Sequence, residues 1–370
     1  MDQLLKTPLH SWHAAHNGRM VDFAGWSMPV QYSSIIEEHQ QTRNSVGIFD
    51  VSHMGRLYFS GQGVEDFLDG LTTRRIVGVP CKKVRYSLIT NSEGGILDDV
   101  LVYHVPDLTG NPFYMMVVNA SNRQKIVSWI ESHLGDSGIG LDDRTDSTAM
   151  IAVQGPKANS VVAKLADMNP EDLGYYEGAT SKIGNDEVLI SRTGYTGEDG
   201  CEIICNADAA ESIWQKVFDL SQPLGGGVSG LAARNSLRLE AGMPLYGHEL
   251  SESLNPAQTD LKFAIQMKDR EFVGKHSILA ARNDDQLPVR IGLVLEGKRA
   301  AREGCSILKD EKVVGEITSG AFGPTLEKSI SMGYIHPEHA AVDTEVTIDI
   351  RGKQHSAKVT GLPFYQREKA

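Results

Sequence analysis

Cysteine is scarce in this chain of 370 residues, which contains only Cys81, Cys201, Cys205 and Cys305. So few thiols in a chain of this length exclude a disulfide-stapled scaffold and favour a reducing compartment. Cys201 and Cys205 lie four residues apart in an expected strand and therefore share one face, where an extended backbone holds them too far apart for a disulfide. We therefore expect free, buried thiols and a cytoplasmic location.

Long apolar runs and a basic excess are also missing. No run approaches the roughly 20 apolar residues of a membrane helix, and Met1–Lys6 has no apolar stretch of the kind that a signal peptide requires. The 36 basic and 48 acidic side chains give a net charge of −12, which disfavours a nucleic-acid partner because phosphate backbones are repelled. Small anions can still bind to local arginines. We expect neither a membrane nor a nucleic acid as partner.

Signatures of resident cofactors and metals are weak. Gly225–Gly230 has the glycine spacing of a dinucleotide loop, but a helix precedes it where that motif requires a strand, so we expect Ser229 to cap the next helix instead. The histidines at every third position (His10, His13 and His16) have no cysteine or carboxylate among them, which favours an exposed helical face over a ligand set. We expect no nicotinamide, flavin or metal.

The first 282 residues alternate strands and amphipathic helices. Expected helices begin at Ser34 (a capping box, ending near Gly47), Val64 (to Leu71), Ser121 (to Leu134), Pro156 (to Ala166) and Asp208 (ending near Leu220). Expected strands cover 47–61, 84–90, 96–105, 114–118, 149–153, 188–192 and 202–205. Hairpins mixed with crossover helices predict an α+β fold with ferredoxin-like antiparallel layers, and not a doubly wound sheet.

The composition changes after about Asn283. From Val289 onward, six strand-like runs are separated by glycine, proline and aspartate turns, which predicts a small β-barrel or sandwich. A boundary within Arg282–Pro288 then divides the chain into an α+β region, 1–282, and a β domain, 283–370. We expect two subdomains, interleaved in sequence, within the first region.

An acidic pair in the segment GGILDDVLVY is the first candidate for chemistry. Side chains alternate across a strand, so Asp98 and Asp99 face opposite ways. Both faces are otherwise apolar, with Ile96 on one and Leu97 on the other, so at least one carboxylate is surrounded by buried neighbours, where an unpaired charge is costly. Capping of the hairpin end is the structural alternative, and a functional carboxylate is favoured over it.

Two further segments carry polar groups. In the segment SRTGYTGEDGCE, which begins at Ser191, three glycines allow a close backbone approach to a ligand, although they also suit tight turns. In the helix that follows Leu231, Arg234 and Arg238 share one face, and the structural alternative is a solvated stripe paired with Glu240 or Glu249. These residues alone indicate an enzyme or binding protein with carboxylates and an arginine near a cleft.

At these residues the chain resembles the glycine cleavage T-proteins. The resemblance is carried in order, from about Thr7 to Tyr365, by the segments MVDFAGW, FDVSHMG, GGILDD, Ser191–Gly200, RLEAG and GEITSG. It implies three domains in a clover-leaf around a central folate pocket, with a six-stranded β-barrel at the C-terminus.

The resemblance also implies site residues. The family's catalytic aspartate corresponds to the second of the pair, Asp99. Its folate contacts correspond to Met54, Tyr86, Val117, Tyr175, Tyr195, Glu202 and Arg234, with a C-terminal contact near Tyr365. Many relatives carry aspartate where this chain has Asn235, a departure that implies a weaker salt bridge to Arg234.

The implied reaction takes an aminomethyl group from the dihydrolipoyl arm of H-protein to tetrahydrofolate as co-substrate. It releases ammonia and forms 5,10-methylenetetrahydrofolate, in functional coupling to glycine decarboxylase and dihydrolipoyl dehydrogenase. Glu202 would accept the guanidine-like edge of the pterin, Arg234 would satisfy a folate oxygen, and the tyrosines and Met54 would wall the ring. Asp99 would stabilise positive charge on the transferred group.

Two alternatives stay open at this point. Another tetrahydrofolate-dependent methyl or aminomethyl transferase, or a demethylase of a sulfonium compound, would keep the fold and change the donor. A non-catalytic folate-binding relative, of the kind involved in iron–sulfur assembly, would carry a cysteine-containing glycine motif where this chain has Thr193–Gly200, and would tend to lack the aspartate at Asp99.

Overall fold

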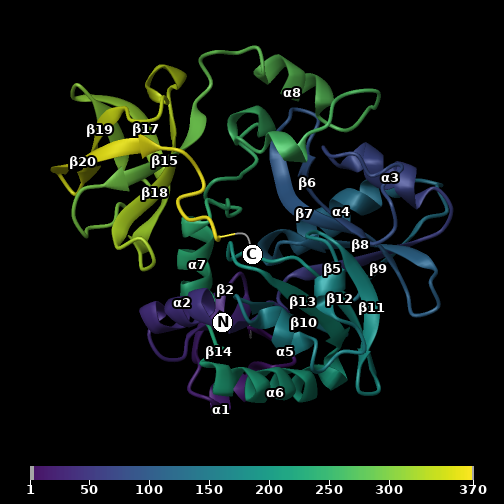
Figure 1. The fold of residues 1–370 in the computed structure, drawn as a ribbon. Helices are drawn as coiled ribbons and strands as arrows, with labels where there is room; N and C mark the ends of the chain where they lie inside the picture. The colour runs from purple at the N-terminus through teal and green to yellow at the C-terminus, as the bar shows by residue number, and fades with distance from the viewer. Residues whose placement is uncertain (1–3, 369–370) are drawn as a thin grey trace.

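The computed structural model describes residues 4–368 and arranges them in three lobes around helix α7, Leu231–Glu240 (Figure 1). Helix α7 packs against helix α2, Ile35–Asn44, against strand β3, Trp26–Gln31, and against the C-terminal barrel. The barrel forms one lobe, and two large sheets with their helices form the other two. No helix among residues 4–368 is long and apolar enough to cross a membrane.

A five-stranded sheet, in the order β6-β7-β8-β5-β9, forms the core of the second lobe. Its strands are β5 Gly55–Ser60, β6 Lys83–Thr90, β7 Ile96–Pro106, β8 Pro112–Val118 and β9 Gly140–Asp143. Helices α3, Val64–Leu71, and α4, Arg123–Leu134, cover one face, where Leu68 and Ile130 are fully buried with residues of the sheet. The expected β6–β7 hairpin and both helices are confirmed.

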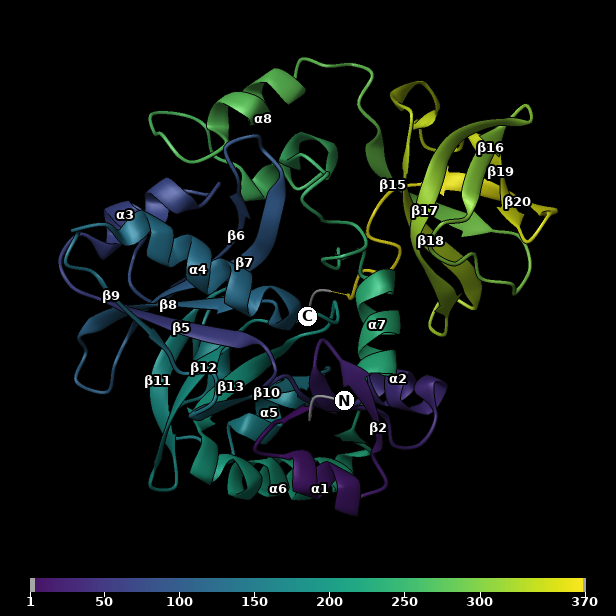
Figure 2. The same cartoon turned by 180° about the vertical axis from the view of Figure 1, so that it is seen from behind.

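A six-stranded sheet, in the order β11-β12-β13-β10-β4-β14, forms the third lobe. Its strands are β4 Gly47–Asp50, β10 Thr148–Gln154, β11 Gly178–Ile183, β12 Asp186–Ser191, β13 Gly200–Asn206 and β14 Gly227–Val228. The outer face packs against helices α5, Ala158–Val162, and α6, Ala210–Ser221 (Figure 2). The inner face packs against the five-stranded sheet through one shared core that includes Phe49 and Val117. Cys201 and Cys205 are buried free thiols of the outer core.

The expected extended segment 47–61 is two strands in different sheets. Strand β4 pairs within the six-stranded sheet and β5 within the five-stranded sheet. The chain crosses between the sheets at Val51–Met54, which brings His53 and Met54 to the centre of the molecule. The alternation of apolar residues could not show this change of sheet.

Six antiparallel strands form the C-terminal lobe as a closed barrel. They are β15 Val289–Leu295, β16 Ser306–Lys309, β17 Lys312–Gly323, β18 Lys328–Ile335, β19 Glu345–Ile350 and β20 Lys353–Thr360. Its core includes the fully buried Leu293, Ile307, Ile317 and Ile348. The α+β fold with a six-stranded barrel is therefore confirmed, while the division at 282/283 stays a prediction.

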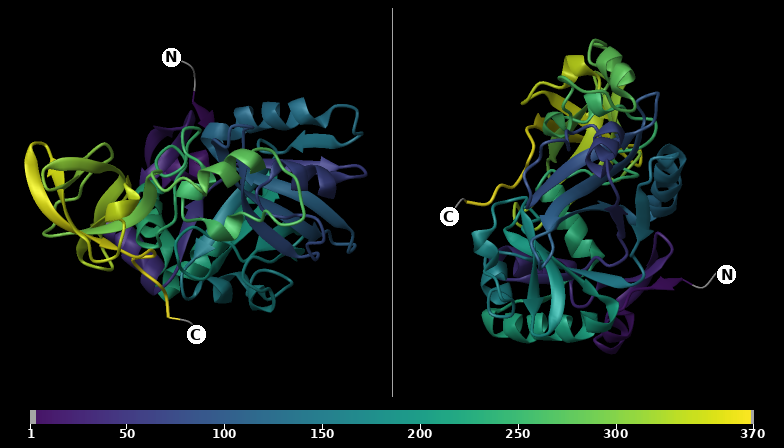
Figure 3. Two further views of the ribbon diagram at one scale, coloured as in Figure 1. Left: turned by 90° about the horizontal axis from the view of Figure 1, so that it is seen from above. Right: turned by 90° about the vertical axis from the view of Figure 1, so that its right-hand side faces the viewer.

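The first and last described segments lie on opposite faces of the molecule (Figure 3). A three-stranded sheet of β1 Leu5–Lys6, β2 Arg19–Phe23 and β3 lies on one face, and the segment that follows β20 lies on the other (Figure 3). That segment leaves the barrel and returns to α7, where the Tyr365 amide donates to the Glu240 carbonyl (2.7 Å).

Three expected helix starts are wrong in detail. Ser34 does cap α2, since its hydroxyl accepts from the Glu37 amide. By contrast, α5 is only five residues long and begins after Pro156, and α6 has no side-chain cap. Helix α7 starts after Gly230 rather than Ser229, because the buried Glu38 carboxylate accepts the Gly230 amide (2.8 Å). A distant carboxylate thus replaces the local cap.

The expected exposure of His10, His13 and His16 on one helical face is wrong for His13. Helix α1, His10–Ala15, buries His13 completely, with Nε2 2.9 Å from Asp50 and Nδ1 2.8 Å from the Tyr32 hydroxyl. Burial opposes ionisation of Asp50, but hydrogen bonds and charge from His13 outweigh it and lower the Asp50 pKa to about 2. His13 ties α1 to the six-stranded sheet.

Candidate active site

A cavity of about 1080 Å³ lies where the lobes meet. Its walls come from β2, β6, β7, β8, β13 and α7, from the segment 241–248, from the turn 260–263 and from the returning tail at Leu362 and Pro363. Figures 1 and 2 show these elements surrounding the centre of the molecule. Segments more than 300 residues apart in sequence therefore share one site.

The structure brings eight of the nine predicted site residues into the wall of this cavity. They are Met54, Tyr86, Asp99, Val117, Tyr175, Tyr195, Glu202 and Arg234. Tyr365 is not among the lining residues. Its ring instead stacks on the Arg43 guanidinium, 3.9 Å from Cζ to the ring centroid, at the junction with α7.

A bulge in β7 sets the direction of the aspartate pair. Ile89 of β6 pairs with Asp98, but Thr90 pairs with Ile96, so Leu97 is an extra residue. Asp98 consequently faces the helices, fully buried, while Asp99 faces the cavity. As expected, Asp98 and Asp99 point to opposite faces of the strand. Because of the bulge, however, Ile96 and Leu97 each point to the face opposite to the expected one.

Asn119, at the end of β8, holds both carboxylates. Its Nδ2 lies 2.8 Å from Asp98 Oδ1 and 2.7 Å from Asp99 Oδ1, and its backbone amide donates to Asp98 (3.0 Å). The Tyr86 hydroxyl donates to the other oxygen of Asp99 (3.0 Å), and Asn122 donates to Asp98 (2.7 Å). Two adjacent carboxylates are thus kept in fixed directions by neutral donors.

Burial dominates the electrostatics of the pair. Desolvation and the neighbouring charge of Asp99 raise the pKa of Asp98, and its amide donors only partly offset this. Desolvation likewise raises the pKa of Asp99, against the hydrogen bonds from Tyr86 and Asn119. An ionised Asp99 therefore gains from any positive charge that enters the cavity.

Glu202 and Arg234 form a second polar group in the wall. Glu202, on β13, is buried and accepts a hydrogen bond from the Thr193 hydroxyl. Burial raises its pKa, although Thr193 and the charge of Arg234 oppose this. Arg234 lies over the Tyr195 ring at 4.7 Å, and its shielded Nη1 has no hydrogen-bond acceptor within residues 4–368. The guanidinium is poised to bind an acceptor supplied from outside the chain.

Arg238, which shares a helix face with Arg234, has a structural role. It is buried and pairs with Glu249 (2.8 Å), and its Nη2 donates to Ser319 of the barrel (2.7 Å). The expected link between Asn235 and Arg234 is wrong, because Asn235 accepts from Arg238 Nε (2.9 Å). Arg238 is therefore not part of a solvent-exposed stripe of charges, although its partner is Glu249, one of the two that were expected.

Several lining residues were missed by the sequence analysis. Asn119 follows the apolar strand β8, and that abrupt change to a polar residue was its only signal. His53 lines the cavity, and its Nδ1 has no hydrogen-bond partner among residues 4–368. Burial lowers its pKa to about 4, so its ring is neutral near pH 7. Arg74 and Arg85 also line the cavity. In the described part of the chain, no three His, Cys, Asp or Glu side chains are grouped as metal ligands.

Comparisons with known proteins match the whole length of the chain. Residues 9–269 match the family described as the GCVT N-terminal domain, and residues 289–366 match the glycine cleavage T-protein C-terminal barrel domain. The chain is 40% identical to the aminomethyltransferase of Corynebacterium jeikeium, covering 100% of both chains. It is also 40% identical to that of Thermotoga maritima, covering 98% of each. The crystal structure of glycine cleavage system aminomethyltransferase T from Bartonella henselae superposes with a TM-score of 0.91, at 30% identity and 98% coverage of both chains.

Proposed function

The chain belongs to the glycine cleavage T-protein family and is an aminomethyltransferase, and we propose that its central cavity transfers the aminomethyl carbon of dihydrolipoyl H-protein to tetrahydrofolate. The observation that carries this proposal is the grouping of Asp99, Glu202 and Arg234 in one cavity wall with five tyrosines. The products are ammonia, 5,10-methylenetetrahydrofolate and the dihydrolipoyl form of H-protein.

The polar groups of the wall fit a reduced folate. A pterin carries a ring N–H beside an exocyclic amine, and the buried Glu202 carboxylate can accept both. The Nη1 atom of Arg234 has no partner in the described part of the chain and requires an acceptor, which a folate oxygen supplies. Tyr86 and Tyr195 provide flat, partly apolar surfaces for the ring. Glu202 and Arg234 would therefore hold and orient the pterin.

Asp99 would stabilise the charge that develops during transfer. The carbon–sulfur and carbon–nitrogen bonds of the aminomethyl thioether break, so its carbon becomes electron-poor, and a fixed carboxylate of low solvent exposure stabilises that charge without reorganising. When bound, tetrahydrofolate supplies the two nitrogens that take up the carbon and releases two protons, one for the thiol and one for ammonia. Tyr86 and Asn119 hold Asp99 in place for this role.

The reaction requires partners in the same compartment. Membership of the glycine cleavage family supports H-protein as the donor, with glycine decarboxylase loading the lipoyl arm and dihydrolipoyl dehydrogenase reoxidising it. The bacterial relatives support a cytoplasmic location for these steps.

A direct assay tests the proposal. Aminomethyl-loaded H-protein, tetrahydrofolate and the protein are mixed, and ammonia and methylenetetrahydrofolate are quantified. We expect the two products in equal amounts, with a dependence on both substrates. Ammonia without folate turnover, or transfer from a sulfonium methyl donor but not from H-protein, would refute the proposal.

A further inference from the structure

Glu202, the carboxylate proposed to hold the pterin, is buried with little support from charged neighbours. It is 4% exposed, and within residues 4–368 the Thr193 hydroxyl is the single hydrogen-bond donor to its carboxylate oxygens. Arg234 contributes its positive charge, but the described residues contain no ion pair between the two side chains. An ionised carboxylate in such surroundings is costly unless the donors that it does have are strong.

Thr193 ends a hydroxyl chain of three buried side chains, Tyr103, Ser191 and Thr193, that leads to Glu202. The Ser191 and Thr193 hydroxyls lie 2.7 Å apart, and the Tyr103 hydroxyl lies 3.4 Å from that of Ser191. Because an ionised carboxylate can only accept, the Thr193 hydroxyl donates to Glu202. Each hydroxyl has one proton, so Ser191 donates to Thr193 and Tyr103 donates to Ser191. Hydrogen bonds that run in one direction polarise one another, which strengthens the last of them.

The hydroxyl chain joins the two large sheets behind the cavity wall. Tyr103 belongs to β7 and is fully buried in the core that the two sheets share. Ser191 ends β12 and pairs with Glu202 of β13 in the six-stranded sheet. The backbone at Thr193 is fixed separately, since Gln154 Nε2 donates to the Thr193 carbonyl (3.1 Å). Removal of the Thr193 hydroxyl therefore leaves this anchor of the loop in place.

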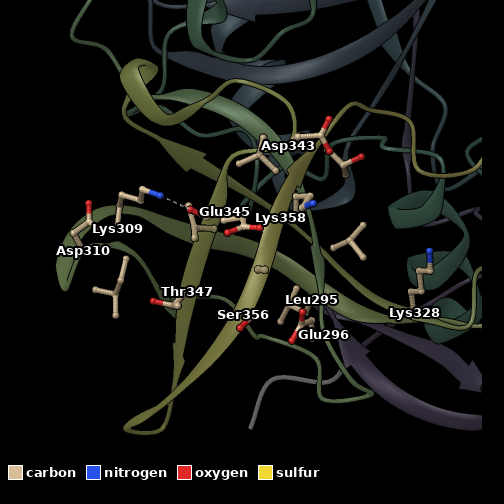
Figure 4. Close-up of a pocket in the computed structure, with 16 residues that line it drawn as sticks. Leu295, Glu296, Lys309, Asp310, Lys328, Asp343, Glu345, Thr347, Ser356 and Lys358 are labelled. Carbon is tan, nitrogen blue, oxygen red and sulfur yellow. Dashed lines mark hydrogen bonds between the residues drawn. The ribbon is translucent and has the colours of Figure 1, made fainter.

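A second hollow of the molecule is organised in the opposite way. It has a volume of about 640 Å³ and lies on the outside of the barrel, where lysines and carboxylates line it (Figure 4). Glu345 and Lys358 are exposed there, and Lys309 donates to the Glu345 carbonyl (3.0 Å). Exposed charges of this kind are weakened by water and salt. The buried hydroxyls behind Glu202 are protected from both.

We propose that the hydroxyl chain is the positioning group that keeps Glu202 ionised and aimed into the cavity, and that its last member, Thr193, thereby sets the pH range over which a pterin is bound. This inference rests on the proposed function, because it assigns the support of the carboxylate that would hold the pterin. A protonated carboxyl group has an O–H donor in place of one acceptor, so it cannot accept both N–H groups of the pterin edge. Folate binding should therefore require the ionised form of Glu202.

The groups around Glu202 allow its ionisation to be followed. The titratable groups on the neighbouring elements are Tyr103 of β7, Tyr175 and Tyr176 before β11, Cys201 of β13 and Arg234 of α7. Burial raises the pKa of the three phenols and of the thiol, so these stay neutral near pH 7, and the guanidinium stays charged. Burial also raises the pKa of Glu202, whereas the Thr193 hydrogen bond lowers it. Asp99 titrates in the same cavity, so the comparison of variants, and not a single profile, assigns an acid limb to Glu202.

The pH dependence of the folate Kd tests the inference. Calorimetry under anaerobic conditions gives the Kd of tetrahydrofolate monoglutamate between about pH 5 and about pH 9 for the wild type and Thr193→Val. We expect Kd to rise as the pH falls. In Thr193→Val this acid limb should lie about one to two pH units higher, because the carboxylate loses a hydrogen bond that favours its charged form. KM for tetrahydrofolate should rise accordingly, while kcat at saturating folate stays within about threefold.

Matched variants separate control of ionisation from damage to the loop. Thr193→Ser keeps the hydroxyl and should keep the wild-type limb. Ser191→Ala removes the second donor and should move the limb upward by less, and it carries the same test if Thr193→Val does not fold. Thr196→Val removes a buried hydroxyl of the same loop that donates to Gln154 (3.0 Å) and not to Glu202, so it should leave the limb in place. Thermal unfolding shows which variants are folded, and the titration of the ligand itself is common to all of them.

Three outcomes would overturn the inference. In the first, Thr193→Val keeps the wild-type limb. In the second, it weakens folate binding by the same factor at every pH, which would indicate a contact without control of ionisation. In the third, Thr196→Val moves the limb as far as Thr193→Val, which would assign the effect to loop packing. Turnover of aminomethyl-loaded H-protein by the wild type in these cases would leave the proposed function intact, whereas a folded wild type that binds no folate at any pH would refute both.

Discussion

Asn119 has two amide hydrogens, and an aspartate accepts each of them. Because both carboxylates are acceptors, the amide group must present Nδ2 to Asp98 and Asp99. Its side-chain oxygen, Oδ1, accepts no hydrogen bond from residues 4–368, and Asn119 lines the cavity. Asn119 is therefore a positioning residue for Asp99, fixed from behind by Asp98.

Replacing Asn119 should change the pH dependence of the reaction. Burial raises the pKa of Asp99 and the Asn119 donor lowers it, and the working form is the carboxylate. In the wild type, kcat should fall as the pH decreases, with an acid limb above the ordinary carboxyl pKa of about 3.9. In Asn119→Ala the limb should move upward by about one pH unit or more, because a lost charge-assisted hydrogen bond costs about 1.5–3 kcal/mol.

The kcat–pH profile separates this role from a loss of folding. A merely structural role for Asn119 would lower kcat by the same factor at every pH and leave the limb in place. Asn122→Ala removes a donor to Asp98 but none to Asp99, so it should move the limb less.

Glu202→Gln should weaken folate binding more than it slows transfer. Glutamine replaces one carboxylate oxygen by an NH2 donor, so it cannot accept the two parallel hydrogen bonds of the pterin edge, and the loss of about 1.5–3 kcal/mol corresponds to roughly 10- to 150-fold in Kd. Titration of tetrahydrofolate by calorimetry measures this, with Glu177→Gln, a carboxylate that does not line the cavity, as control. An unchanged Kd would remove Glu202 from the binding role, and an unchanged Kd with collapsed turnover would make it catalytic.

The direction of a single side chain was predictable where the local sequence pattern determines it. The alternation of β7 gave the opposition of Asp98 and Asp99, and the resemblance placed eight residues in one cavity. Asn119 was not predictable, because its role depends on partners that only the fold brings near. Tyr365 is the reverse case: the resemblance implies a contact near it, and the structure stacks its ring on Arg43 while the neighbouring Leu362 and Pro363 line the cavity.

At the scale of elements, periodicity identified most strands and helices but not their exceptions. The β6–β7 hairpin and α3 were expected at nearly their observed bounds. The bulge at Leu97 was not, because an extra residue leaves an all-apolar pattern unchanged. The start of α7 was misplaced, because Glu38 of α2, and not a neighbouring side chain, satisfies its first amide.

The ion pair between Arg238 of α7 and Glu249 should dominate the docking of the barrel. Glu249 also accepts from the Thr318 hydroxyl (2.6 Å) of β17. Although desolvation opposes it, the charge of Arg238 lowers the pKa of Glu249. The stabilisation is therefore present above the unfolded pKa of about 4.3 and is lost as the pH falls toward the lower folded value.

Glu249→Gln should lower the free energy of unfolding by about 3–5 kcal/mol near neutral pH, because it leaves the buried Arg238 uncompensated. Urea denaturation measures this. Glu252→Gln breaks an exposed pair with Lys125 in the same segment and should cost less than about 1 kcal/mol. Equal effects of the two variants would contradict a structural role for the Arg238–Glu249 pair.

At the scale of the whole molecule, the sequence pattern gave the class of fold but not the arrangement. Segment 47–61 looks continuous, yet it belongs to two sheets, and nothing local shows where the chain crosses. The clover-leaf around a central cavity was predictable only through the family resemblance. The cavity wall joins β2 to the tail at Pro363, and such long-range closure has no local signature.

A ligand in this cavity should stabilise the entire fold. It contacts segments from several lobes, and a ligand that binds only the native state adds RT ln(1 + [L]/Kd), about 2.7 kcal/mol at 100 times Kd. Tetrahydrofolate should therefore raise Tm in a concentration-dependent manner, by roughly 2 °C or more for a chain above 250 residues. Folate that binds on calorimetric titration without raising Tm would place it outside the interlobe cavity.

The most direct test is a single turnover of aminomethyl-loaded H-protein with tetrahydrofolate, comparing the wild type with Asp99→Asn. We expect Asp99→Asn to bind folate with Kd within about threefold and to transfer about 100- to 1000-fold more slowly. Asp98→Asn makes the same change on the opposite face and acts on Asp99 indirectly, through Asn119 and through the lost neighbouring charge, so it should lose no more than about tenfold. If Asp99→Asn transfers at the wild-type rate, or if Asp98→Asn alone abolishes transfer, Asp99 is not the carboxylate on which the reaction depends.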